Sequence, residues 1–241
     1  MAIKRYVPKD TNMVLENFRH QDNFALYLNK IEVHNFEKKY KFPKIWKPDY
    51  KTDDYYEKIK KAFDIVEFEL TVEDNLVIGL GLASVYETSI TLHHIYGVPY
   101  IPGSSIKGSF RSYIIQEKFD NDEDKALEKE WFVEIFGSQE QQGNIVFFDA
   151  FSEDVEIKKD IMNPHYPDYY DEKAYPTDTQ NPRPINFLVC KGTFKFMFGL
   201  QKDFEVEKKN IKEWLEDNFK KAMKEFGIGA KTAVGYGYFY G

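Results

Sequence analysis

The chain has 241 residues, of which 42% are hydrophobic and 17% aromatic, and its formal net charge is −7. A chain of this length buries roughly 70–75% of its unfolded surface and needs no disulfide or metal to fold. Its single cysteine, Cys190, excludes an intramolecular disulfide and a cysteine-based zinc site. Because no run of about 18 apolar residues can span a membrane and the first residues lack the apolar segment of a signal peptide, we expect a soluble cytoplasmic protein.

Residues 1–63 are predicted to form an N-terminal helical elaboration. One helix is expected over about 10–31, and a second, capped by Thr52 or Asp53, is expected to end near Phe63. A connection rich in Lys and Pro separates them, and no recognisable chemistry falls in this part of the chain.

Residues 64–241 are predicted to form the main domain. The period-2 alternation that follows Asp64 indicates a half-buried strand, and the apolar spacing after Glu205 indicates an amphipathic helix. The expected elements are a strand over 65–72, an extended segment over 77–100, helices over 103–119 and 125–136, a buried strand over 144–151, a long strand or bent hairpin over 185–200, a helix over 205–226 and a last strand over 234–240. This order matches an α+β, ferredoxin-like (RRM-like) split βαβ fold with two helices on one face of the sheet.

A long polar insertion interrupts this domain at 152–184. It is rich in Pro and Tyr, and an irregular segment of this length inside a compact domain is usually functional or disordered. Its tyrosines favour an ordered loop that touches a partner.

The first motif is Ile-Pro-Gly-Ser-Ser-Ile-Lys-Gly-Ser-Phe-Arg, at residues 101–111. A Pro-Gly turn followed by serine predicts a capped helix start. Lys107 and Arg111 share one helix face because they are four residues apart. The backbone N–H groups of Gly103 and Ser104 and the positive end of the helix dipole are expected beside them, which predicts an anion site whose usual occupant is phosphate.

The second motif is Gly-Ile-Gly-Ala-Lys-Thr-Ala-Val-Gly-Tyr-Gly, at residues 227–237. Gly227 is predicted to end the preceding helix, and the other glycines let an extended anion approach the main chain beside Lys231 and Thr232. The segment runs from helix into strand, the reverse of a nucleotide-binding P-loop, so an NTPase is not expected. We predict that the two motifs form two sides of one groove for an RNA backbone; the acidic net charge does not preclude a local basic footprint.

Other side chains suggest catalysis less strongly. Glu87, His93 and His94 offer a metal- or histidine-dependent endoribonuclease as the alternative function. Adjacent histidines on a strand point to opposite faces, so packing or backbone hydrogen bonding is the preferred interpretation. Asp149 is expected to be a strand-end or loop-anchoring carboxylate, and no metal site or cofactor is predicted.

With both motifs placed, the chain resembles the RAMP superfamily of CRISPR RNA-binding proteins. Together with Val-Phe-Phe-Asp-Ala-Phe at 146–151 and Met-Asn-Pro-His-Tyr at 162–166, they are most similar to the family of sixth RAMP subunits of type III-B (Cmr) effector complexes, over about residues 64–241. The resemblance implies a non-catalytic subunit in antiviral defence. It is expected near the crRNA 3′ end, contacting crRNA and target RNA and packing beside the backbone RAMP subunit and the first RAMP subunit.

In the backbone subunits of such complexes, an aspartate in the loop before the first motif cleaves target RNA, whereas the comparable loop here offers Glu87. The resemblance places RNA contact on the two motifs. The predicted RNA-binding residues are Gly103, Ser104, Ser105, Lys107, Arg111, Gly227, Gly229, Lys231, Thr232 and Gly235.

Overall fold

A computed structural model describes residues 23–26, 28, 45–47, 50, 52–82, 84, 88–163, 175 and 184–241. Most of the predicted helix over 10–31 lies outside these residues. The elements in chain order are α2 (Phe24–Leu26), β1 (Ile45–Trp46), α3 (Asp53–Ala62), β2 (Asp64–Val72), α4 (Gly103–Phe119), α5 (Glu123–Leu127), α6 (Glu130–Phe136), β3 (Ile145–Phe147), β4 (Glu156–Met162), β5 (Ile185–Lys191), β6 (Thr193–Leu200), β7 (Glu205–Val206), β8 (Lys209–Asn210), α8 (Ile211–Glu225), the 3₁₀ turn η2 (Thr232–Val234) and β9 (Phe239–Tyr240). None of the helices in the described part is long and apolar enough to cross a membrane.

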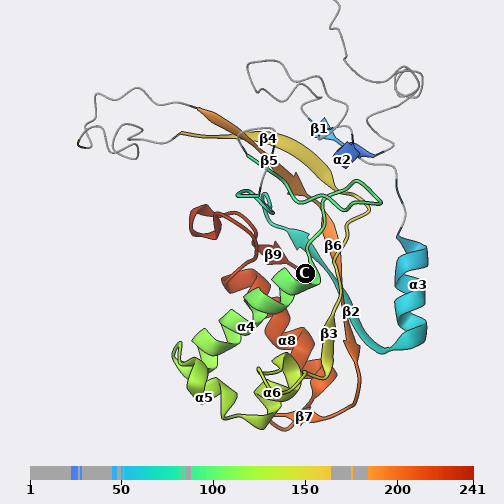
Figure 1. The fold of residues 1–241 in the computed structure, drawn as a ribbon, viewed down its shortest axis with the longest axis vertical. Helices are drawn as coiled ribbons and strands as arrows, with labels where there is room; N and C mark the ends of the chain where they lie inside the picture. The colour runs from blue at the N-terminus through green and yellow to red at the C-terminus, as the bar shows by residue number, and fades with distance from the viewer. Residues whose placement is uncertain are drawn as a thin grey trace, which may run out of the picture.

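A four-stranded sheet in the order β3-β6-β2-β9 forms the centre of the molecule, and all its neighbouring strands are antiparallel (Figure 1). The predicted strand β2 is confirmed, and it pairs with β6 from Asp64 opposite Leu200 to Thr71 opposite Thr193. The alternate residues of β2 are buried on one face, as its sequence period requires. At the other edge of β2, β9 pairs only with Thr71 and Val72.

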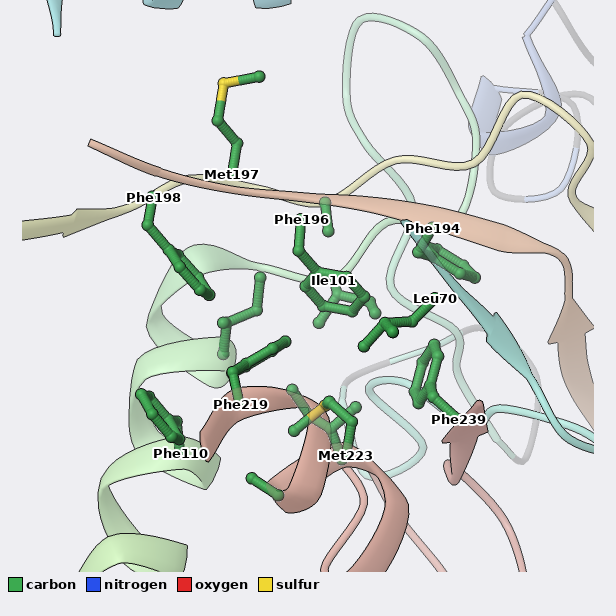
Figure 2. Close-up of a cluster of buried hydrophobic side chains, with 14 of the residues drawn as sticks. Leu70, Ile101, Phe110, Phe194, Phe196, Met197, Phe198, Phe219, Met223 and Phe239 are labelled. Atoms are coloured by element: carbon green, nitrogen blue, oxygen red, sulfur yellow. The ribbon is translucent and has the colours of Figure 1, made fainter. Parts of the chain in front are cut away.

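Helices α4 and α8 lie on the same side of this sheet and bury its inner face (Figure 1). In Figure 2 the rings of Phe110, Phe196, Phe198 and Phe219 converge between the helices and β6. The Phe219 ring is fully buried, and its centroid lies 5.0 Å from those of Phe196 and Phe198 and 5.3 Å from that of Phe110. These contacts join three elements, α4, α8 and β6, through phenylalanine rings.

Helix α3 packs on the opposite, outer face. The Tyr56 hydroxyl accepts a hydrogen bond from the Phe151 amide (3.1 Å) and donates one to the Lys195 carbonyl of β6 (3.3 Å). Met197 points to this face, away from the cluster in Figure 2, and is fully buried. The predicted helix over 53–63 is therefore confirmed, and it covers part of the sheet.

The predicted helix over 205–226 begins six residues later than expected. Residues 205–210 form the β7–β8 hairpin, whose turn residues Glu207 and Lys208 have positive φ (52° and 67°). Burial acts to raise the pKa of Glu207, but its ion pair with Lys118 (2.8 Å) and the hydrogen bond from Trp214 Nε1 (3.1 Å) outweigh burial and lower it. These bonds fix the hairpin against α4 and α8, and Asn210 caps α8 by accepting from the Lys212 amide.

A second sheet, in the order β1-β4-β5, corrects the prediction of an irregular segment over 152–184. Seven residues of β4 pair with β5, from Glu156 opposite Lys191 to Met162 opposite Ile185. Only Ile157 in β4 is buried, so the strand carries no strong apolar signal. Residues 164–174 and 176–183 lie outside the described part of the chain.

The predicted strand or hairpin over 185–200 is one bent strand. Its halves, β5 and β6, belong to different sheets and meet at Gly192. A Cβ at Gly192 would lie 2.4 Å from Ser152 Oγ and 3.0 Å from Asp154 Oδ1, so the bend leaves no space for a side chain.

Three further boundaries differ from the prediction. The helix expected over 125–136 is two helices, α5 and α6, because Lys129 is extended (φ −91°, ψ 116°). The strand expected over 144–151 is regular only over Ile145–Phe147, and Phe151 then forms an isolated bridge with Lys195 of β6. The strand expected over 234–240 is limited to β9 because η2 precedes it.

Candidate nucleic-acid interface

The start of α4 is already bonded to a carboxylate of the protein. The Gly103 N–H donates to Asp149 Oδ1 at 2.7 Å, and the helix begins after Pro102 rather than after a serine cap. A Cβ at Gly103 would lie 2.2 Å from the Phe147 carbonyl oxygen, so glycine is required for this close approach. The prediction that Gly103 offers a free N–H to phosphate is therefore wrong, whereas Asp149 is confirmed as an anchoring carboxylate that also complements the helix dipole.

Lys107 and Arg111 share one face of α4, as predicted, but they line a different groove from the second motif. That groove, of about 620 Å³, lies between α4, α5 and residues 136–140. Arg111 pairs with Glu123 there (2.6 Å), and its guanidinium lies 5.2 Å from the Phe132 ring centroid. The expectation that these cations stand beside the glycine-rich stretch is wrong. Lys107 and Arg111 each follow a serine, Ser105 or Ser109, by two residues, which is about half a helical turn, so their side chains project from the opposite face of α4.

The second motif is a closed loop and not a freestanding cradle. The Ile228 N–H donates to the Gly237 carbonyl (2.9 Å), and the Gly237 N–H donates to the Asn75 carbonyl (2.8 Å). Gly229 has φ +97°, and a Cβ there would lie 2.4 Å from the Val77 carbonyl oxygen. The glycines therefore close the loop and hold it against residues 75–77.

Lys231 and Thr232 follow this closed base. Lys231 is left-handed (φ 65°), its carbonyl accepts hydrogen bonds from the Val234 and Tyr236 amides, and its Nζ lies 5.6 Å from the Phe187 ring centroid. Residues 233–235 are exposed at the tip of the loop. Gly235, with φ +95°, has no atom within 4 Å of a Cβ position, so its role is conformational.

The two motifs nevertheless face each other across a cavity of about 530 Å³. Small residues of α4 form one wall, the loop after α8 forms the other, and the segment after β2 contributes apolar side chains. The lining residues are Leu76, Ile78, Gly79, Leu80, Ile101, Ser105, Gly108, Ser109, Ser112, Phe226, Ile228, Gly229 and Ala230. The structure thus brings the predicted motifs together, through serine hydroxyls and glycine backbone and not through cations.

Sequence reasoning missed two parts of this groove. Ser109 and Ser112 were not singled out, although they fall on the same helix face as Ser105. Residues 77–80 were predicted only as part of an extended segment. Gly79 has φ +71°, and a Cβ there would lie 2.1 Å from Thr91 Oγ1, so this glycine was a signal of a tight turn at the groove.

His93 is held by packing and backbone bonds. Its ring stacks on Tyr96 at 4.8 Å, its Nδ1 accepts a hydrogen bond from the Tyr96 amide (3.3 Å), and burial lowers its pKa. His94 is exposed beside it, and Glu87 lies outside the described residues. Within the described ranges, no three His, Cys, Asp or Glu side chains gather in a way that could hold a metal ion.

The chain combines an antiparallel sheet that two helices cover on one face with a glycine-rich loop after the last helix, and this combination defines a class of protein. The RAMP superfamily profile matches residues 69–240, so the chain belongs to that superfamily. It is 32% identical to CRISPR system Cmr subunit Cmr6 of Pyrococcus furiosus, over 76% of this chain and 69% of that protein. It is also 32% identical to CRISPR system CMR subunit Cmr6 of Saccharolobus solfataricus, over 76% of this chain and 64% of that protein. Within the superfamily, the chain is therefore a member of the Cmr6 family.

A solved structure shares the fold. A chain in the cryo-EM structure of the type III-B Cmr-beta bound to cognate target RNA superposes with a TM-score of 0.62, at 21% identity, covering 99% of this chain and 76% of that one.

Proposed function

We propose that this chain is a non-catalytic, RNA-binding structural subunit of a type III-B CRISPR effector complex. It contacts crRNA and target RNA near the crRNA 3′ end and packs beside the backbone RAMP subunit and the first RAMP subunit. Membership of the Cmr6 family and the fold shared with a chain of Cmr-beta support this assembly. The sheet order β3-β6-β2-β9, with α4 and α8 on one face, supports the ferredoxin-like assignment.

The groove between the two motifs carries the proposal for RNA. Its walls offer the hydroxyls of Ser105, Ser109 and Ser112, which can bond ribose or phosphate oxygens, and glycine backbone that a strand can approach closely. None of its described lining residues is charged, so phosphate neutralisation falls to Lys231 beside the groove. A neutral groove with one flanking cation fits binding that follows the backbone of RNA and does not read its bases.

The outer face of the sheet does not fit as an RNA platform. α3 covers part of it, and the exposed β2 side chains there include Glu67 and Glu69. Carboxylates repel phosphates, and a base-stacking surface needs exposed aromatic rings. RNA is therefore assigned to the groove on the helix side.

Lys107 and Arg111 remain proposed phosphate contacts, now on a second surface. Arg111 must leave or share its ion pair with Glu123 to bind a phosphate, which lowers its contribution. Effects of Lys107→Ala and Lys231→Ala on RNA binding should therefore be independent, because the side chains serve different grooves.

Salt-dependent RNA binding by the full chain tests the assignment. Lys231→Ala should reduce the slope of log affinity against log salt by about one unit or slightly less, as expected for one lost phosphate contact. Gly108→Leu, whose Cβ would have no atom within 4 Å, should weaken binding by filling the groove while thermal stability is kept. Lys61→Ala on α3 is the matched control. Parent-like slopes and affinities for both groove variants would contradict this site.

The endoribonuclease alternative is separated by incubating the protein with labelled CRISPR RNA, with and without Mg²⁺. We expect no cleavage that depends on His93, because its ring is committed to Tyr96 and the neighbouring aromatic residues. Cleavage that disappears in His93→Ala or Glu87→Gln would establish the alternative.

A further inference from the structure

One edge of the sheet is left unpaired over most of its length by the residues that the structure describes. β2 has nine residues, and β6 covers one side of it almost completely, whereas β9 pairs with Thr71 and Val72 alone. The Val72 N–H donates to the Gly192 carbonyl, on the β6 side, so the odd-numbered residues of the strand direct their backbone groups to the other side. In the described part of the chain, the N–H and C=O groups of Ile65, Glu67 and Glu69 have no backbone partner at that edge.

The side chains of this edge are acidic and exposed. Glu67 and Glu69 lie on the outer face, where Glu67 pairs with Lys60 Nζ at 2.9 Å and Glu69 with Lys195 Nζ at 3.7 Å. A cavity of about 420 Å³ adjoins Glu69 and also contains Glu153 and Asp154. Asp64, at the start of the edge, pairs with Lys212 (2.5 Å). Five carboxylates thus stand beside three lysines, and the local charge is negative.

The charge pattern argues against a second copy of the chain as the occupant. Two β2 edges joined antiparallel would place glutamates of one copy opposite glutamates of the other, and like charges directly opposite destabilise a strand pair. A strand with Lys or Arg at alternate positions would instead meet Glu67 and Glu69 with opposite charge. An open edge of this kind is a template for strand addition.

We propose that the β2 edge from Asp64 to Glu69 binds an extended, basic segment of a partner protein by β-strand addition. All neighbours in this sheet are antiparallel, and the added strand follows the same rule. In an antiparallel pair, the residues bonded to Ile65 and Glu67 have their side chains on the same outer face as these two. The basic side chains therefore belong to the residues whose N–H groups point at β2, and the apolar ones lie on the inner face beside Phe68. This inference does not depend on where RNA binds.

The test uses the full chain and a synthetic peptide of four Lys-Val repeats as the probe. Binding should slow amide exchange at Ile65, Glu67 and Glu69, while Val66 and Phe68, already bonded to β6, change little. N-methylation of the peptide lysines should weaken binding at least 10-fold, because it removes the donors that face β2. N-methylation of the valines should leave affinity within about 3-fold. A peptide of four Glu-Val repeats should not bind.

A charge-reversal pair completes the test. Glu67→Lys with Glu69→Lys should weaken the Lys-Val peptide at least 10-fold, whereas Asp124→Lys with Glu128→Lys, the same charge change on α5 and next to it, should not. The proposal is overturned if the lysine peptide does not bind the folded parent, or if the two N-methylated peptides bind equally or in reverse order. Self-association that protects the same three amides would also overturn it, by making a second copy the occupant.

Discussion

Removing the carboxylate of Asp149 is the sharpest perturbation of the helix start. Asp149→Ala deletes the acceptor of the buried Gly103 N–H, which lies 2.7 Å from Oδ1. A hydrogen bond to a charged group contributes about 1.5–3 kcal/mol. Asp149→Asn keeps an oxygen acceptor and loses only the interaction of its charge with the helix dipole, about 0.3–1 kcal/mol. The alanine variant should therefore be the less stable of the two.

Thermal unfolding measures the difference. A domain of 150–250 residues loses about 2–4 °C of Tm per kcal/mol, so Asp149→Ala should lower Tm by about 4–8 °C for a loss near 2 kcal/mol, and Asp149→Asn by about 1–3 °C. The alanine variant also frees the helix start for an anion. Inorganic phosphate should then raise its Tm more than that of the parent, compared with chloride at equal ionic strength. Equal Tm values for the parent and Asp149→Ala would refute the capping role. Equal decreases in Tm for Asp149→Ala and Asp149→Asn would refute the assignment of separate contributions to the hydrogen bond and to the charge.

Three further predictions concern stability and are checked by urea unfolding. Gly229→Ala should lower stability more than Gly235→Ala. Both glycines have positive φ, which costs an alanine about 1–3 kcal/mol of strain, but only at Gly229 would the Cβ also collide, 2.4 Å from the Val77 carbonyl oxygen. Equal losses of stability would show that the backbone around Val77 moves to relieve this contact. Glu207→Gln should lower stability by about 1 kcal/mol or less at pH 7, since the carboxylate is half exposed. Because the folded pKa of Glu207 is lowered, the loss should stay constant above about pH 5 and shrink as the pH falls through that pKa, and a loss that does not change down to pH 3 would contradict the ion pair. Phe219→Ala should cost about 3–5 kcal/mol by leaving a cavity among its neighbouring rings, and a cost below about 1 kcal/mol would mean that the core collapses to fill it.

The sequence predicted the elements whose burial pattern is strong. β2 alternates and α8 repeats its apolar residues at helical spacing, and both patterns survive because one face of each packs on the core. β4 was missed because its single buried side chain, Ile157, gives no period, and the pairing with β5 that creates the strand lies about 30 residues away. The break between α5 and α6 depends on one extended residue, Lys129, which has no distinctive sequence signal.

The sequence predicted that the two motifs would lie together, but it did not predict which side chains they would present to the groove. The two motifs line one groove, as expected, yet the direction of each α4 side chain depends on which face of the helix packs on the sheet. That choice turns Ser105 and Ser109 toward the glycine-rich loop and sends Lys107 and Arg111 to the other groove. Asp149 reaches Gly103 only through the folded arrangement of two segments 46 residues apart, so the sequence indicated an anchor without indicating what it anchors.

The bend at Gly192 has a mechanical consequence. Because β5 continues into β6, the β4–β5 hairpin is an arm whose root is a strand in the middle of the core. Asp154 clamps this root by accepting from Ser152 Oγ and from the Thr193 amide, each at 2.7 Å. A force that a neighbouring molecule applies to the arm is therefore transmitted directly to β6. We therefore expect the β4–β5 arm to move together with β6 when another subunit binds it.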